Sequence, residues 1–131
     1  MRRHIFVVGV LIMAAGGTGG CMTTYTGTAG VSGPGEYNRL TGIFTQEFSA
    51  SLDATWEATI EAVQALELSI AGRAKDQLGG RVVAKRADGT EVEVTLKPRG
   101  LTFTFVQIEV GRGDKDASIR ISQELERRLK K

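Results

Sequence analysis

The sequence is poor in the side chains that most often perform chemistry. Its 131 residues include one histidine and one cysteine, His4 and Cys21. Both precede the part of the chain in which we expect a folded domain, so that domain has neither an imidazole nor a thiol. This excludes from the domain a catalytic triad that uses histidine, a zinc site of cysteine and histidine, and an internal disulfide. We therefore expect no enzyme activity, no metal and no cofactor.

The sequence also lacks an excess of positive charge outside its amino terminus. Seventeen Lys and Arg side chains stand against fifteen Asp and Glu, a formal net charge of +2. Arg2 and Arg3 account for the difference, and both lie in a segment that we expect to be removed. A nucleic-acid-binding domain needs a surplus of Lys and Arg to displace counterions from phosphates. We therefore expect no nucleic-acid partner.

The first twenty residues have the three regions of a secretory signal peptide. Two arginines stand near the start, residues 5–15 form an apolar run interrupted only by Gly9, and residues 16–20 are small. The run is too short for a transmembrane helix, which needs about 20 apolar residues. We interpret residues 1–20 as the signal peptide of an exported bacterial protein.

The segment Thr18-Gly19-Gly20-Cys21 is similar to the lipobox of bacterial lipoproteins, although Thr18 stands where such boxes usually have leucine. The resemblance implies that Cys21 is the lipid attachment site, the first mature residue and the link to a membrane. Met22 stands where an aspartate commonly retains lipoproteins at the inner membrane. This implies the periplasmic side of the outer membrane rather than the inner membrane. The alternative is an ordinary secretory signal cut near residues 15–17, which leaves Cys21 a free thiol.

Residues 21–39 are rich in Gly, Thr and Ser and have neither helical nor strand periodicity. We predict a flexible tether here, which as a coil spans about 20 to 25 Å on average. Residues 40–131 then form a single domain.

The domain alternates between strand and helix patterns. A strand is predicted around Leu40, Phe44 and Phe48, and further strands over residues 68–73 and 81–87, joined by a turn at Gly79-Gly80. Two helices are predicted. The first starts at Ser51 or Asp53 and buries Trp56, Ile60, Val63 and Leu66, and the second covers residues 116–130 and buries Ile121, Leu125 and Leu129.

Two later turns set the predicted pairing. Asp88-Gly89 is typical of a two-residue type I′ hairpin, which places Val83 opposite Val94. Arg99-Gly100 predicts a second hairpin that pairs Leu96 with Phe103 and Val94 with Phe105.

The last strand changes phase between Phe105 and Val106, which predicts a β-bulge there and leaves Thr102 and Thr104 facing solvent. The expected fold is α+β, an antiparallel sheet of about five strands packed with two helices, in the order β-α-β-β-β-β-α.

Two short patterns could carry chemistry. Glu57 and Glu61 share a helix face and could bind a hard cation, but a solvated helix face is the favoured interpretation because no further oxygen ligands accompany them. Residues 111–114, Gly-Arg-Gly-Asp, precede the last helix as a phosphate-binding loop would. Asp114 would repel a phosphate, so we expect it or Asp116 to cap the helix.

Four pieces of the sequence together resemble a family of small bacterial lipoproteins, the domain of unknown function 3568. The pieces are Cys21, the run Ser49–Ala58, the hairpin Arg86–Thr90 and the loop Val110–Asp114. The resemblance extends from Cys21 to Leu129. It implies a single α/β domain on a lipid anchor and assigns no catalytic residue.

Two functions remain open. The first is a non-catalytic interaction module that offers its sheet face or edge to another protein of the cell envelope. The second is a carrier or sensor that binds a lipid or other small apolar ligand between sheet and helices, which needs an enclosed apolar cavity. We expect the large aromatic residues to fill the core, so the first function is favoured, and no ligand-binding residue is assigned. These aromatics are Phe44, Phe48, Trp56, Phe103 and Phe105.

Overall fold

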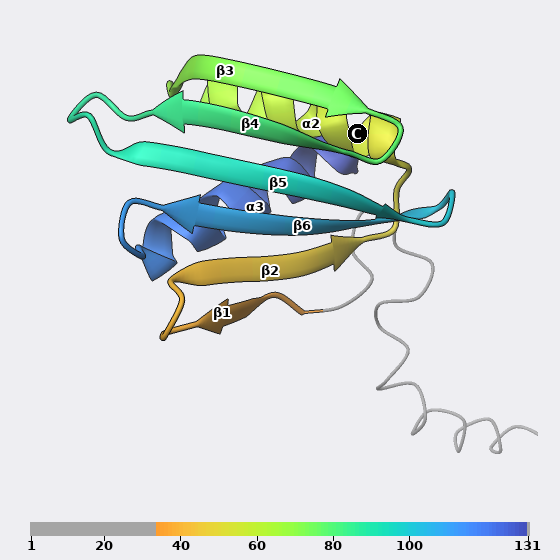
Figure 1. Ribbon diagram of the computed structural model, residues 1–131, viewed down its shortest axis with the longest axis horizontal. Coiled ribbons are helices and arrows are strands. Elements are labelled where there is room, and N and C mark those ends of the chain that lie inside the picture. Colours follow the sequence, from red (N-terminus) through yellow and green to blue (C-terminus); the bar gives the residue numbers. More distant parts are fainter. Residues whose placement is uncertain (1–33, 131) are drawn as a thin grey trace, which may run out of the picture.

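The computed structural model describes residues 34–130 (Figure 1). Six strands form an antiparallel sheet in the order β1-β2-β6-β5-β4-β3. Figure 1 shows both helices behind the sheet, so one face is covered and the other is open. The elements are β1 (Glu36–Asn38), β2 (Ile43–Phe48), α2 (Leu52–Ala65), β3 (Ser69–Asp76), β4 (Gly79–Lys85), β5 (Glu91–Arg99), β6 (Phe103–Val110) and α3 (Lys115–Leu129).

The predicted α+β class, with an antiparallel sheet and two helices, is confirmed. The sheet has six strands rather than about five because Glu36–Asn38 pair with β2, with Tyr37 opposite Phe44. Regular structure therefore begins inside residues 21–39, which were predicted as tether. Such a short strand leaves almost no pattern in the sequence, since Tyr37 is its only residue that packs against the core. The predicted signal peptide and most of the predicted tether lie outside the described residues.

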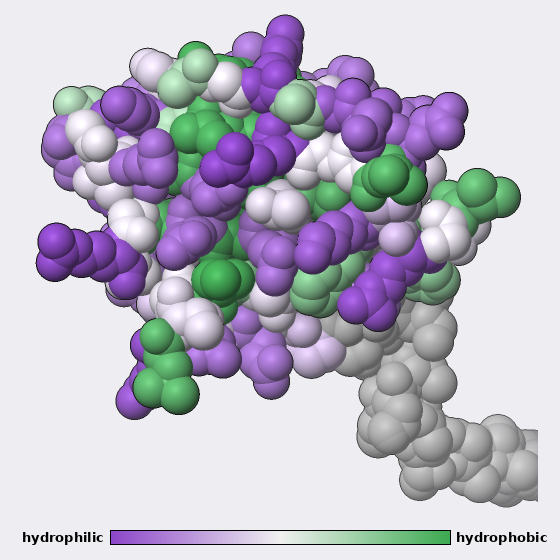
Figure 2. Space-filling view, viewed as in Figure 1, coloured by the Kyte–Doolittle hydropathy of each residue, from purple (hydrophilic) through white to green (hydrophobic). Residues whose placement is uncertain are grey.

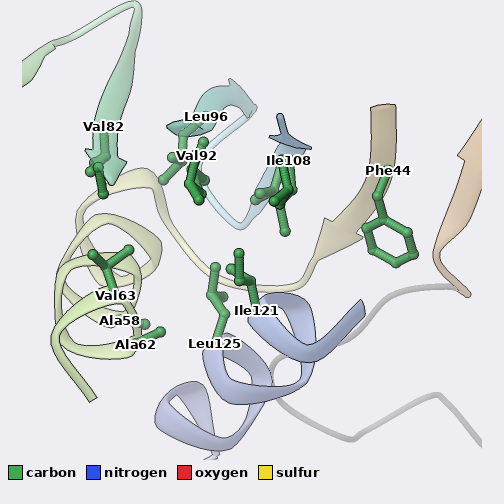
Figure 3. Packing of buried hydrophobic residues seen from close by; sticks show 14 of the residues in the cluster. Phe44, Ala58, Ala62, Val63, Val82, Val92, Leu96, Ile108, Ile121 and Leu125 are labelled. Atoms are coloured by element: carbon green, nitrogen blue, oxygen red, sulfur yellow. The ribbon is translucent and has the colours of Figure 1, made fainter. Parts of the chain in front are cut away.

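The core lies between the covered face of the sheet and the two helices. Alternate residues of the sheet point into it, among them Val82, Val94 and Ile108, which are at most 1% exposed. The second helix contributes Ile121 and Leu125, as their spacing of four residues predicts. Figure 3 shows both side chains pointing from α3 toward the sheet. The sheet and helix patterns thus meet in one apolar layer.

Helix α2 presents small residues to this layer. Its buried residues are Thr55, Ala58, Thr59, Ala62 and Val63. The predicted core residues Trp56 and Ile60 are only half-buried and pack at the margin. The buried hydroxyl of Thr55 donates to the carbonyl of Ser51 at 2.8 Å, and that of Thr59 donates to the carbonyl of Thr55 at 2.7 Å. Because both hydroxyls are satisfied within the helix, they can be buried at little cost.

Gly79 and Gly80 begin β4 and do not form the predicted turn. Asp76 pairs with Gly79, so the turn consists of Gln77 and Leu78. A Cβ at Gly80 would lie 2.8 Å from two ring carbons of Trp56. Gly80 is therefore required for close packing beneath the indole, and a Cβ at Gly79 would lie 2.6 Å from the Leu96 carbonyl oxygen. A sequence pattern does not distinguish these needs from a chain reversal.

The β4–β5 hairpin has a longer loop than Asp88-Gly89 predicted. The Gly89 N–H donates to the Arg86 carbonyl, and the Arg86 N–H donates to the Thr90 carbonyl, both at 2.9 Å. A type I′ turn needs positive φ at both central residues, and in this loop only Gly89 has it. The connection is therefore a three-residue loop. The pairing shifts by one residue as a result, and Val94 lies opposite Val82 instead of Val83.

The predicted pairing of Leu96 with Phe103 is also wrong. Leu96 pairs with Val106, and the register of β5 and β6 is regular from end to end, without the predicted bulge. Phe103 and Phe105 therefore project from the open face, although the sequence analysis predicted that their side chains fill the core. The phase change in the sequence is real, but it marks aromatic residues on the outer face and not an irregular strand.

Two further corrections follow from this register. Thr104, predicted to face solvent, is fully buried, and its hydroxyl donates to the Ala50 carbonyl at 2.9 Å. The sheet does contain an irregularity, but it lies in the edge strand β3, where the register shifts between Ile70 and Gly72.

Gly80→Ala should lower the free energy of unfolding by about 1 to 3 kcal/mol, because the new methyl group overpacks against Trp56. Gly72→Ala on the neighbouring strand is the matched control, since a Cβ there meets nothing within 4 Å. We expect the control to be neutral or stabilising by about 0.5 to 1 kcal/mol. Urea unfolding followed by circular dichroism measures both, and equal effects would contradict the close contact with Trp56.

Candidate binding surfaces

Neither helix covers the open face of the sheet, and this face is the first candidate surface. Figure 2 shows it with separate hydrophobic areas among hydrophilic side chains. Charged, polar and apolar residues alternate across it without one continuous apolar patch. Its half-buried residues on the inner strands are Ile43, Thr45, Glu47, Val83, Glu93, Thr95, Phe105, Gln107 and Glu109.

A hollow of about 140 Å³ lies on this face over β2, β6 and β5, lined by Ile43, Glu93, Thr95, Gln107 and Glu109. The pairing of β5 with β6 places Glu93 directly opposite Glu109 and Thr95 directly opposite Gln107. Like charges at directly opposite positions destabilise a sheet. One side of the hollow, formed by Thr95 and Gln107, can therefore make hydrogen bonds. The other side, formed by Glu93 and Glu109, is acidic and lowers the stability of the sheet.

Only one of these two carboxylates is neutralised by a neighbour. Arg81 of β4 donates to Glu93 across the strands, and this hydrogen bond raises the pKa of the Arg81 guanidinium above its usual value. Within residues 34–130 Glu109 makes no ion pair. The hollow consequently keeps one uncompensated, half-buried negative charge.

A cation covers the aromatic part of the same face. The guanidinium of Arg99 lies 4.7 Å from the centroid of the Phe105 ring, within the range of a cation–π contact. Its Nε lies 3.7 Å from a carboxylate oxygen of Glu47. Arg99 thus shields Phe105 from water and keeps the ring on the surface.

A second candidate surface is a cleft of about 230 Å³ where α2 ends and α3 begins. Its apolar lining consists of Leu66, Leu68, Ala87, Val92, Val110, Ala117 and Ile121, and its charged lining of Glu67, Arg86 and Arg120. Glu67 has a φ of 60°, in the left-handed position that usually takes glycine after a helix. Within the described residues Arg120 makes no ion pair, so one guanidinium faces an apolar cleft unpaired.

Asp114 ties this cleft to the start of α3. Its carboxylate accepts the Ala117 N–H at 3.0 Å and lies 3.3 Å from the Arg86 guanidinium of the β4–β5 hairpin. The backbone hydrogen bond from Ala117, with a smaller contribution from Arg86, holds the pKa of Asp114 below its usual value. The loop Gly111–Asp114 therefore ends in a helix cap, as expected, and Ser51 caps α2 in the same way through the Ala54 N–H.

The other predicted site residues are not brought together. Glu57 and Glu61 are exposed on α2, and a Glu61 oxygen lies 3.9 Å from Arg128 of α3. Within residues 34–130 no group of three or more His, Cys, Asp or Glu side chains could hold a metal ion. No helix in this part of the chain is long and apolar enough to cross a membrane. Cys21, the predicted lipid attachment site, lies outside the described residues.

The hollow was missed because the predicted register was wrong. With Val94 opposite Phe105, Glu93 would face Val106 and the two carboxylates would lie apart. The correct pairing could be read from two runs of alternate apolar residues, which are Val92, Val94 and Leu96 on β5 and Val106, Ile108 and Val110 on β6. Matching those two buried runs, instead of the turn motif, would have placed Glu93 beside Glu109.

Comparison with known protein families gives a match. A family model described as a protein of unknown function, DUF3568, matches residues 4–128, which include all six strands and nearly all of α3. No curated protein matches the chain.

Asp114→Ala should lower the free energy of unfolding by about 1 kcal/mol at pH 7, a typical cost of losing a helix cap. The folded pKa lies below the ordinary value of 3.8, so the carboxylate stabilises the fold above that pH and loses its effect as the pH falls through the folded pKa. The difference from the unchanged protein should therefore shrink below about pH 4. Urea unfolding at pH 7 and pH 3 measures this.

Asp116→Ala serves as the control, because Asp116 is exposed in the same helical turn and does not cap it. A deficit for Asp114→Ala that is equal at both pH values would contradict the role of its carboxylate.

Proposed function

The chain belongs to the DUF3568 family of unknown function, and from that premise we propose an exported bacterial lipoprotein anchored through lipid on Cys21 to the periplasmic side of the outer membrane. Its domain is a non-catalytic interaction module of the cell envelope. The open face of the sheet binds the partner, another envelope protein. The absence of histidine and cysteine from residues 34–130 supports the non-catalytic role.

The observation that carries the binding role is the pair of facing carboxylates. Glu109 lies directly opposite Glu93, and the Arg81–Glu93 ion pair weakens their repulsion but leaves the charge of Glu109 uncompensated. A residue that costs stability in this way is a candidate for function. A Lys or Arg side chain of a partner that entered the hollow would neutralise Glu109. Thr95 and Gln107 line the same hollow and supply hydrogen-bonding groups that orient such a side chain. The expected partner therefore presents a basic side chain on a flat surface.

Crosslinking in intact cells tests this function. A photoreactive residue at Thr95 or Gln107 lies on the open face, and one at the exposed Glu57 of α2 is the control on the opposite side of the domain. We expect one dominant protein adduct from the first two positions and none from the control. Equal adducts from all three positions, or no adduct from Thr95 and Gln107, would contradict the proposal.

The same experiment gains a second readout from Glu109→Gln. This change removes the repulsion with Glu93 and should stabilise the isolated protein by about 0.2 to 1 kcal/mol. It should also reduce the adduct from Thr95, because the charge that attracts the partner is lost. Glu36→Gln, at the exposed edge of the same face, should leave both measurements unchanged. A stabilised variant with an undiminished adduct would remove Glu109 from the binding site.

The cleft between α2 and α3 supports a second candidate function, the carrier or sensor of a lipid or other small apolar ligand. Its apolar lining and the unpaired Arg120 suit a short apolar chain with an anionic group. The volume of about 230 Å³ is smaller than that of most ligand pockets, so this function ranks second. A photoreactive residue at Ala87, on the cleft, should capture a lipid-sized molecule if this second function holds.

The anchor has its own test. Cys21→Ala should abolish labelling by a tagged fatty acid and move the protein from the membrane fraction to the soluble fraction. Met22→Ala leaves the cysteine in place and should retain the label. Labelling of Cys21→Ala equal to that of the unchanged protein would contradict attachment at Cys21.

A further inference from the structure

The exposed apolar side chains are unevenly distributed over the sheet. Within residues 34–130, three of the four large hydrophobic residues that are exposed lie at one end: Leu78 at 84%, Leu101 at 90% and Phe103 at 38%. Leu78 lies in the β3–β4 turn and Leu101 in the β5–β6 turn, and both turns are at the right-hand end of Figure 1. Figure 2 shows hydrophobic side chains protruding from the same margin. We call Leu78 and Leu101 the leucine tips.

The turns themselves do not require leucine. The Asp76 carboxylate stabilises the β3–β4 turn by accepting a hydrogen bond from the backbone N–H of Leu78 at 2.8 Å, so the leucine side chain takes no part in it. The β5–β6 turn is set by Gly100, whose φ of 78° reverses the chain and leaves Leu101 at the outermost position. Turn positions favour polar residues and glycine, and these would serve at either tip. The formation of the two turns therefore does not explain why both tips carry leucine.

The described part of the chain begins toward the end of the sheet that carries the leucine tips. Glu36 of β1 lies opposite Thr45, and Asn38 lies opposite Ile43, so β1 runs away from the leucine tips. Pro34 precedes Glu36 and is therefore displaced toward the tips. Twelve residues separate Pro34 from Cys21, a stretch that spans at most about 45 Å when extended and about 20 Å on average as the predicted coil.

Leu40 provides the internal comparison. It is 96% exposed, but it lies in the β1–β2 turn at the opposite end of the sheet. The eight residues of β6 connect the two ends and span about 26 Å. An anchor that reaches the domain from the side of the leucine tips therefore holds those tips nearer the membrane than Leu40.

The charges at this end permit contact with lipid. Lys75 is paired with Asp53 at 2.6 Å, and Arg99 lies 3.7 Å from Glu47. Lys97 is exposed and makes no ion pair within residues 34–130. A long cationic side chain can keep its charge at the headgroups while its stem lies along apolar surface. Asp76, whose carboxylate accepts the Leu78 N–H, makes no ion pair within the described residues either. One unpaired cation and one unpaired anion therefore flank the leucine tips, and their surroundings are neutral overall.

We propose that Leu78 and Leu101 insert into the interfacial layer of the membrane to which Cys21 anchors the chain, so that the domain rests on its β3–β4 and β5–β6 turns. This proposal rests on the lipid anchor of the proposed function. Phe103 lies at the boundary between this contact and water, and Lys97 contacts anionic headgroups. The strands then stand away from the membrane, and the open face is presented sideways to a partner.

Depth-dependent quenching on vesicles tests the proposal. A lipidated Cys21 has no free thiol, so a cysteine introduced by Leu78→Cys, Leu101→Cys or Leu40→Cys is the only site for a thiol-reactive dye. The lipidated full mature chain is reconstituted in vesicles of phosphatidylethanolamine and phosphatidylglycerol that contain a brominated lipid. We expect dyes at 78 and 101 to be quenched at least twofold more than the dye at 40. Equal quenching at the three positions overturns the proposal.

Hydrogen exchange on the unlabelled protein is the control for the possibility that the dye itself drives insertion. Anchored protein should exchange the amides of residues 77–79 and 100–102 more slowly than soluble Cys21→Ala protein, with no change at residues 39–42. Equal exchange in the two forms overturns the proposal. Slower exchange at the tips in cells but not on vesicles also overturns it and identifies a protein in place of lipid as the occupant. A reactive thiol at Cys21 in the purified mature chain overturns the lipid anchor, and the tip proposal with it.

Discussion

Both helices pack on the same face of one antiparallel sheet, and this determines which residues remain available for contact. The packing depends on small residues of α2, because Ala58, Ala62 and the internally hydrogen-bonded Thr59 let that helix lie close to the strands. Helix α3 fills the remaining area with Ile121 and Leu125. Most apolar side chains of the strands are buried in this layer. The opposite face therefore carries mostly polar and charged side chains, and its few apolar side chains lie between charged ones. The open face of the sheet and the cleft of about 230 Å³ where α2 ends and α3 begins are therefore the surfaces that remain available for contact.

The class of the fold and its helices could be predicted from the sequence because their signals are local. Ser51 as a cap and the spacing of Ile121 and Leu125 each depend on a few neighbouring residues. The pairing of strands was lost because it depends on turn geometry, which Asp88-Gly89 and Arg99-Gly100 do not determine: each loop holds a single glycine with positive φ and spans three residues. The one-residue error placed Val83 opposite Val94, and the three-residue error moved Thr104 and Phe105 to the wrong faces. The candidate site inherited this error, since the proximity of Glu93 and Glu109 is a property of register alone.

The proposed anchor and the described domain complement each other physically. The proposed lipid on Cys21 would supply attachment without orientation, because a lipid on one residue fixes where the chain meets the membrane and not how the domain is turned. The exposed leucines at one end of the sheet supply orientation without attachment, because two side chains bury too little apolar surface to hold a protein at a bilayer. Together they would leave the hollow over β2, β6 and β5 open to neighbours within the plane of the membrane. The acidic and hydrogen-bonding groups of that hollow would then give such an encounter its selectivity, since the apolar area around them is small.

The irregular pairing of the edge strand β3 bears on how such a protein behaves when it is crowded. Confinement to a surface raises the local concentration of identical domains, and an exposed flat strand would then pair with its copy and extend the sheet from molecule to molecule. In β3 the register shift between Ile70 and Gly72 interrupts the row of backbone groups, and Arg73, Lys75 and Asp76 place charges along the rest of the edge. The other edge, β1, offers only three residues. If the proposed anchor holds the domain at high density, these features of its two edges would oppose polymerisation and leave the open face available to a different protein.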